Sequence, residues 1–224
     1  QPGGIEEYII QAVVEVDFLK MRKNAELMAD LWEKSQKCHI ISSIGTDLNC
    51  EFHDRPAHIA DGAATTPGDV QFFPGAQVIV APIEETINGT IVVDGMVCPG
   101  GIVSSPVTIK MEKGAIVNIK GKADANAWES WLKSLDDPII YHLSHLNIGF
   151  NPLAKMNDNA TEAERVLGAV TFGFGHQPNF LKGNITTGKF HTEAILVSPT
   201  IYLDGKIVLM DNKLDEKLGF VKMV

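Results

Sequence analysis

Short apolar runs rich in valine and isoleucine, separated by tight turns, constrain the fold of this chain more than any other feature of its sequence. They occupy residues 77–82, 90–97, 107–111, 115–120, 139–150, 194–197, 200–203 and 206–210. Short runs of β-branched residues are typical of strands. Tight turns between them are predicted at Asn88-Gly89, Lys113-Gly114 and Asp204-Gly205. The runs therefore predict sheets built mainly of neighbouring antiparallel strands.

A few stretches have helical periodicity instead. Apolar residues recur at a period near 3.6 between residues 18 and 37, where Asp17 is a candidate N-cap, and again between 124 and 135. A shorter helix is predicted at 162–167, with Thr161 as its cap. Residues 5–16 are rich in isoleucine and valine. The predicted fold is α+β, with mixed, mainly antiparallel β-sheets and a few packed helices.

The character of the sequence changes near residue 62. Before it, a helix leads to a strand at 38–43, a glycine turn and a second strand at 49–54, which is an α/β arrangement. A loop of glycine, alanine, threonine and proline follows at 62–68, and the chain is β-rich after it. We therefore predict two parts, an α/β segment at 1–61 that ends an N-terminal domain and a β-rich metal-site domain at 62–224.

Composition excludes several classes of protein. Of 224 residues, 45% are apolar and 21% charged, enough for a full core. The net charge of −9 and the absence of a basic run argue against nucleic acid or an anionic membrane as partner. Three widely spaced cysteines without a C-x-x-C pair fit a reducing cytoplasm better than a disulfide framework. The apolar content and the many strands make assembly into a homo-oligomer the expectation.

Residues 166–205 contain the best candidates for metal ligands. His191 and Glu193 are two apart, so on a strand their side chains point to the same face. His176 follows an apolar run broken by Gly173 and Gly175, where a strand is expected to end. If the intervening loop folds back, two imidazoles and one carboxylate converge, a set that suits zinc or ferrous iron. The alternative is that these side chains are solvated polar residues on a sheet edge.

A series of sequence blocks resembles one superfamily of metalloenzymes. The blocks are GTDL, PGAQVIVAPIEETINGT, HLNIGFNPLA, LGAVTFGFGH and FHTEAIL, followed by the Asp-Gly hairpin. In this order they resemble the metal-dependent aminopeptidases of the aminopeptidase T and S type. The shorter bacterial relatives are closest, namely 2,5-dihydroxypyridine 5,6-dioxygenase and 5-nitroanthranilic acid aminohydrolase. The resemblance covers about residues 38–210. Because family members are longer at the N-terminus, the resemblance implies that this sequence is their C-terminal, site-bearing part.

The resemblance carries over to individual residues only in part. Gln77 stands where the aminopeptidases have a metal-binding glutamate, and His145 where they have a second one. The family histidine of the glycine-rich block falls at Thr171, and the H-x-D pair matches His191-Thr192-Glu193. The resemblance implies a metal enzyme that is no peptidase, with Gln77 and Thr171 facing the substrate.

Three functions remain open at this level. A divalent metal (Zn, Mn or Fe) on His176, His191 and Glu193 would activate water for hydrolysis of a C–N bond in a small-molecule substrate, aromatic or not, with Glu84 and His145 as proton carriers. We expect this hydrolase, because most of the superfamily hydrolyses. The same ligands would also suit a non-haem Fe(II) ring-cleaving dioxygenase. A non-catalytic binding domain that has lost its metal is the third candidate.

Overall fold

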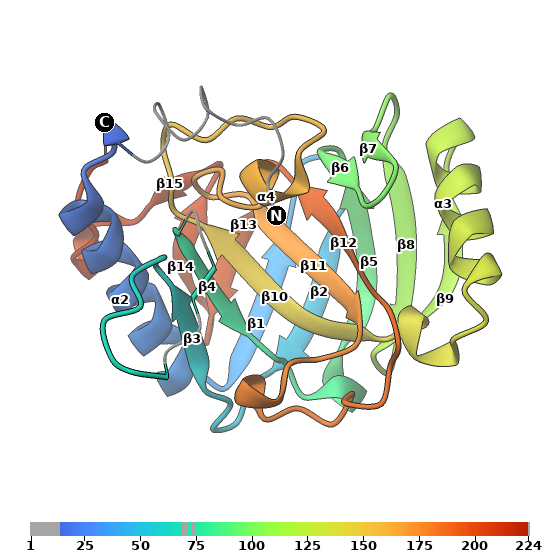
Figure 1. Cartoon of the computed structure of the whole chain (residues 1–224), viewed down its shortest axis with the longest axis horizontal. Coiled ribbons are helices and arrows are strands. Elements are labelled where there is room, and N and C mark those ends of the chain that lie inside the picture. Colours follow the sequence, from blue (N-terminus) through green and yellow to red (C-terminus); the bar gives the residue numbers. More distant parts are fainter. Residues whose placement is uncertain (1–13, 69–70, 73–74, 224) are drawn as a thin grey trace.

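Two stacked β-sheets form the body of the protein (Figure 1). The computed structural model describes residues 14–68, 71–72 and 75–223. The larger sheet has the strand order β15-β14-β13-β1-β2-β5-β8-β9 and the smaller one β3-β4-β10-β11-β12-β6-β7. Every pairing between these strands is antiparallel. The predicted α+β class with mainly antiparallel sheets is confirmed.

The bounds of the elements are as follows. The strands are β1 Lys37–Ile41, β2 Asp47–Glu51, β3 Ala57–Ala60, β4 Gln77–Val80, β5 Asn88–Val93, β6 Met96–Val97, β7 Gly101–Ile102, β8 Val107–Glu112, β9 Ala115–Lys120, β10 Leu143–Gly149, β11 Val170–Gly175, β12 His191–Leu196, β13 Thr200–Leu203, β14 Lys206–Met210 and β15 Lys213–Leu214. The α-helices are α2 Phe18–Lys34, α3 Ala123–Ser134 and α4 Ala160–Ala163. Short 3₁₀ helices are η2 Glu84–Thr86, η3 Pro138–Tyr141, η4 Asn179–Leu181 and η5 Glu216–Leu218.

The core lies between the two sheets. Strands β10 and β11 turn Leu146, Phe172 and Phe174 inward, and α2 and α3 add Trp32 and Trp128 at the two ends of the sandwich. All five side chains are at most 2% exposed. Burial of aromatic and branched side chains on both inner faces provides the main stabilisation. The outer face of the smaller sheet is left to carry polar residues.

The helices begin largely as predicted. The Asp17 side chain caps α2 by accepting a hydrogen bond from the Lys20 backbone N–H at 3.1 Å. The helix ends at Lys34 because Lys37 already pairs with Glu51 in the larger sheet. Helix α4 starts two residues before the predicted position. Asn159, not Thr161, provides its cap.

Two predicted strand boundaries are wrong. Asn88-Gly89 is no turn: both residues lie in β5, and a Cβ on Gly89 would stand 2.1 Å from the Asp47 carbonyl oxygen. The glycine is needed because β2 approaches closely there. The predicted strand 139–150 begins instead with η3, whose Asp137 cap and Pro138 favour a helical turn. The predicted hairpins at Lys113-Gly114 and Asp204-Gly205 are present.

Both sheets contain strands from each side of the predicted boundary at residue 62. β1 and β2 pair with β13 and β5, and β3 pairs with β4. The division into 1–61 and 62–224 stays a prediction. The predicted feature at residues 5–16 lies mostly outside the described residues. No described helix combines the length and the apolar character needed to cross a bilayer.

Candidate metal centre

Three potential metal ligands converge on the outer face of the smaller sheet. His145 comes from β10, and His191 and Glu193 come from β12. Their ligand atoms all lie within 4.8 Å of one another. The two imidazole rings stack with centroids 5.1 Å apart and an interplanar angle of 14°. Among the described residues, this is the group of histidines and acids whose spacing suits a metal ion.

Gly173 of β11 is the residue that allows these strands to share one site. It pairs with His145 on one side and with Glu193 on the other. A Cβ on Gly173 would lie 2.3 Å from Cε1 and 2.6 Å from both ring nitrogens of His145. The imidazole therefore occupies the space that a side chain on β11 would fill. A glycine in the interior of a strand marks such a close approach.

Hydrogen bonding fixes the tautomer of His191. Its Nδ1 lies 3.0 Å from the His176 carbonyl oxygen, which can only accept, so Nδ1 carries the proton and donates it. The lone pair is then on Nε2, which lies 3.6 Å from Oε1 of Glu193. A backbone carbonyl that holds Nδ1–H is the usual outer partner of a metal-binding histidine. His191 is thus oriented to ligate through Nε2.

Burial keeps both imidazoles neutral. It lowers the pKa of His145 well below the ordinary value of 6.5, and the nearby His191 ring lowers it further. Burial also lowers the pKa of His191, although the hydrogen bond to His176 and the charge of Glu164 act in the opposite direction. Neutral imidazoles carry the free lone pair that a metal requires.

A second carboxylate, Glu164, lies beside Glu193. It accepts hydrogen bonds from Gln77 Nε2 at 2.6 Å and from the Arg165 guanidinium at 2.8 Å. Burial, followed by the charge of Glu193 and a hydrogen bond with it, raises the pKa of Glu164 well above its ordinary value, although Arg165 and Gln77 act to lower it. Two neutral imidazoles and two crowded carboxylates form a donor set that fits a divalent cation.

A small pocket opens beside the cluster. Its volume is about 190 Å³, below the roughly 300–1,000 Å³ usual for drug-sized ligands, so it suits a molecule with a single ring. It is lined by Phe72, Gln77, Ile79, His145, Asn147, Glu164, Arg165, His176, Pro178, Phe180, Leu181, His191 and Glu193. The exposed phenyl rings of Phe72 and Phe180 make part of its wall.

The predicted site residues divide into two groups. Gln77, His145, His176, His191 and Glu193 all line this pocket. The imidazole of His176 is exposed and lies outside the cluster of three. His145 occupies the position in the cluster that was predicted for His176. Thr171 is fully buried on β11 opposite Asn147 and does not line the pocket.

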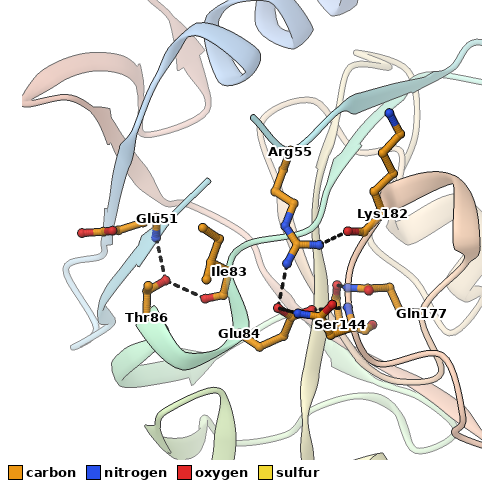
Figure 2. A network of polar contacts seen from close by, with 9 residues as sticks. Glu51, Arg55, Ile83, Glu84, Thr86, Ser144, Gln177 and Lys182 are labelled. Atoms are coloured by element: carbon orange, nitrogen blue, oxygen red, sulfur yellow. Dashed lines mark hydrogen bonds and ion pairs between the residues drawn. The ribbon is translucent and has the colours of Figure 1, made fainter. Parts of the chain in front are cut away.

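Glu84 lies elsewhere, in an ion pair with Arg55 (Figure 2). Arg55 Nη2 is 2.8 Å from Glu84 Oε2, and the other Glu84 oxygen accepts the Asn184 backbone N–H at 2.7 Å. Arg55 also donates to the Lys182 carbonyl oxygen. Glu84 thereby ties the loop between η4 and β12 to the start of β3, which is a structural role.

Glu164, Asn147 and Gly173 are site residues that sequence reasoning missed. Of the three, Gly173 has the clearest signal in the sequence, because it lies two residues from Gly175 in an apolar run. From the sequence, it is interpreted only as a break in that run. Glu164 lies just after a four-residue helix, among other charged residues, and has no pattern of its own.

Comparison with known proteins identifies the family. The family model described as "NicX: 2,5-dihydroxypyridine 5,6-dioxygenase" matches residues 13–216. The chain belongs to this family. It is 28% identical over 192 residues to the 2,5-dihydroxypyridine 5,6-dioxygenase of Pseudomonas putida, covering 80% of this chain and 54% of that relative. The predicted hydrolase is therefore wrong, because both the family and this relative are named as a dioxygenase.

Solved structures give the same picture. The 2,5-dihydroxypyridine dioxygenase from Pseudomonas putida superimposes with a TM-score of 0.79 at 25% identity, over 87% of this chain and 59% of that one. Wild-type AmpT from Thermus thermophilus gives 0.70 at 16% identity, over 93% and 57%, which shows a shared fold alone. The chain spans just over half the length of the relatives it matches.

Proposed function

We propose that this chain carries the iron site of a dioxygenase that opens a small hydroxylated aromatic ring. The observation that carries the proposal is the cluster of two neutral imidazoles and one carboxylate beside a pocket of single-ring size. Two histidines and one carboxylate leave metal positions open and are the ligand set of non-haem Fe(II) oxygenases. The name of the Pseudomonas putida relative makes 2,5-dihydroxypyridine the first substrate to test.

In this proposal, His145, His191 and Glu193 hold the metal, with His145 in place of the predicted His176. Ferrous iron bound there supplies the redox chemistry that lets dioxygen react with an electron-rich ring. Gln77 and Glu164 hold the Glu193 side of the site, since Gln77 donates to the carboxylate next to Glu193. An ordered outer partner of this kind keeps ligands in position.

The remaining pocket residues act on the substrate. Ile79, Leu181 and Phe180 exclude water from the space beside the cluster and offer flat apolar surface to a ring. The His176 imidazole is exposed in the pocket wall, and the described residues offer its ring nitrogens no hydrogen-bond partner. A free nitrogen there can accept the proton of a ring hydroxyl as the substrate binds.

The complete donor set does not support the alternative of a domain that has lost its metal.

Oxygen consumption tests the proposal. The protein would be stripped of metal with a chelator, loaded without oxygen with Fe²⁺ or with Zn²⁺, and mixed with 2,5-dihydroxypyridine and dioxygen. We expect one O₂ consumed per ring opened with iron and none with zinc. His191→Ala should abolish uptake, whereas His39→Ala, a matched change at an exposed histidine of β1, should not. Stoichiometric iron without ring loss would refute the proposed function.

A further inference from the structure

Asn147 presents a buried hydrogen-bond acceptor that the protein itself leaves unpaired. It lies on β10 two residues from His145, on the same face of the sheet, and lines the pocket. Its side chain is 1% exposed, and its Oδ1 has no hydrogen-bond partner among the described residues. Because nearly all buried polar atoms are paired, an orphan acceptor of this kind calls for an explanation.

The surroundings of Asn147 do not provide a partner. Its neighbour on β4 is Ile79, which packs with Leu181 in one apolar cluster, and both line the pocket. Its neighbour on β11 is Thr171, whose own hydroxyl oxygen is buried and unpartnered. A carboxamide placed in a largely apolar wall lowers the stability of the free protein, because its oxygen is removed from water without compensation. Such a group gains its partner when a ligand with a donor fills the pocket.

We propose that the Asn147 carboxamide oxygen accepts a hydrogen bond from an O–H or N–H group of the ring bound beside His145, and so determines which rings the site accepts. This inference rests on the proposed function for the class of ligand, a planar ring with polar substituents. A ring with a single polar group could reach the metal cluster but would leave Asn147 unpaired. A ring with a second donor would satisfy both. Sites that hydrogen-bond a ligand in this way discriminate strongly against analogues that lack the group.

The test compares the wild type with three variants, using three ligands. Asn147→Leu removes the acceptor with little change in size, and Asn147→Asp retains an oxygen acceptor at the same place. Asn49→Leu, at an exposed asparagine of β2 in the other sheet, is the matched control. Binding of 2,5-dihydroxypyridine, 2-hydroxypyridine and 3-hydroxypyridine to zinc-loaded protein would be measured by calorimetry. Zinc keeps the ligand intact, so binding is separated from turnover.

A role in ligand recognition predicts opposite effects on folding and on binding. Asn147→Leu should leave the melting temperature unchanged or raise it, because an orphan acceptor is removed. Zinc content should not change. Affinity for 2,5-dihydroxypyridine should fall about tenfold or more, and KM for the iron enzyme should rise more than kcat falls. The variant should also lose the preference of the wild type for the diol over at least one of the two monohydroxy compounds. Asn147→Asp should retain part of that preference, and Asn49→Leu all of it.

Several outcomes would overturn the inference. A melting temperature several degrees lower in Asn147→Leu would show that Asn147 is a structural residue. Equal affinity of the wild type and Asn147→Leu for the diol, or an equal loss of affinity for all three ligands, would show that Oδ1 does not accept a hydrogen bond from the ligand. If the wild type binds the diol through Asn147 but iron-loaded protein consumes no oxygen, the proposed function fails and this inference stands. Failure of the wild type to bind any of the three would refute both.

Discussion

Replacing Gly173 with alanine gives the sharpest test of how the fold builds the metal site. The new Cβ would stand 2.3 Å from Cε1 of His145, whereas ordinary van der Waals contact begins at 3.4 Å. The imidazole must therefore retreat by about 1 Å. Metal–nitrogen bonds are about 2 Å long and tolerate errors of only about 0.2 Å. The ring cannot make this move and remain a ligand in the same place.

The expected loss of metal affinity follows from that displacement. Disturbing only the outer partners of ligands costs about 10- to 100-fold in affinity. Because Gly173→Ala displaces a ligand itself, we expect at least about 100-fold, or about 2.8 kcal/mol at about 1.4 kcal/mol per tenfold. The metal-free protein should lose about 1–3 kcal/mol of folding free energy, as is usual when one methyl group is added to a packed region.

The assay compares Zn²⁺ affinity and unfolding in urea for wild type, Gly173→Ala and Gly100→Ala. Gly100 is an exposed glycine near the β6–β7 turn and serves as the control. In a His145→Ala background the same change should cost almost no folding free energy, because the clashing ring is gone. The account of why β11 carries a glycine here would be refuted if Gly173→Ala bound metal as tightly as the wild type. It would also be refuted if the change cost the same folding free energy in the wild-type background and in the His145→Ala background.

Three further predictions concern neighbouring groups. His176→Ala should keep its metal, measured by elemental analysis, while kcat of the iron enzyme falls. His145→Ala should lose the metal. The reverse pattern would restore the predicted ligand set with His176. Glu84→Gln should destabilise the protein by about 3–5 kcal/mol in urea unfolding, because it leaves Arg55 buried without its partner. Glu85→Gln, at the exposed neighbouring residue, should change the stability little. An unchanged urea midpoint for Glu84→Gln would exclude the structural role. Burial lowers the pKa of His145 and of His191 below 6.5, so protons compete poorly with the metal for these nitrogens. Metal content should therefore stay constant as the pH falls to 6.5 and drop only below that pH. Metal release centred above pH 6.5 would contradict the assignment of these two histidines as ligands.

Local pattern was sufficient for most of the strands and for the longer helices. Runs of β-branched residues located the longer strands, and periodicity located α2 and α3, but β3, β7 and β15 were not predicted. The failures occur where a distant part of the chain decides the conformation. Asn88-Gly89 has the composition of a hairpin turn, but its glycine serves the close approach of β2. No property of residues 88–89 alone distinguishes these two uses of the dipeptide.

The same limit applies to the site. His191 and Glu193 were predicted correctly as neighbours on one strand face, because spacing of two residues is a local property. The third member of the cluster comes from β10, two strands away, and its position depends on the register of β10, β11 and β12. His176 is nearer to His191 in the sequence, but it follows the last residue of β11 and lies in the pocket wall. The sequence around Glu84 does not indicate that Arg55, 29 residues before it, forms an ion pair with it.

The location of the metal ion is the most direct test of the central claim. A crystal of the protein loaded with Fe²⁺ without oxygen would be measured at the iron absorption edge, so that anomalous scattering identifies the ion. The account predicts one ion about 2 Å from His145, from Nε2 of His191 and from a Glu193 oxygen. An ion held by His176 instead of His145, or no ion on the outer face of β10–β12, would contradict it.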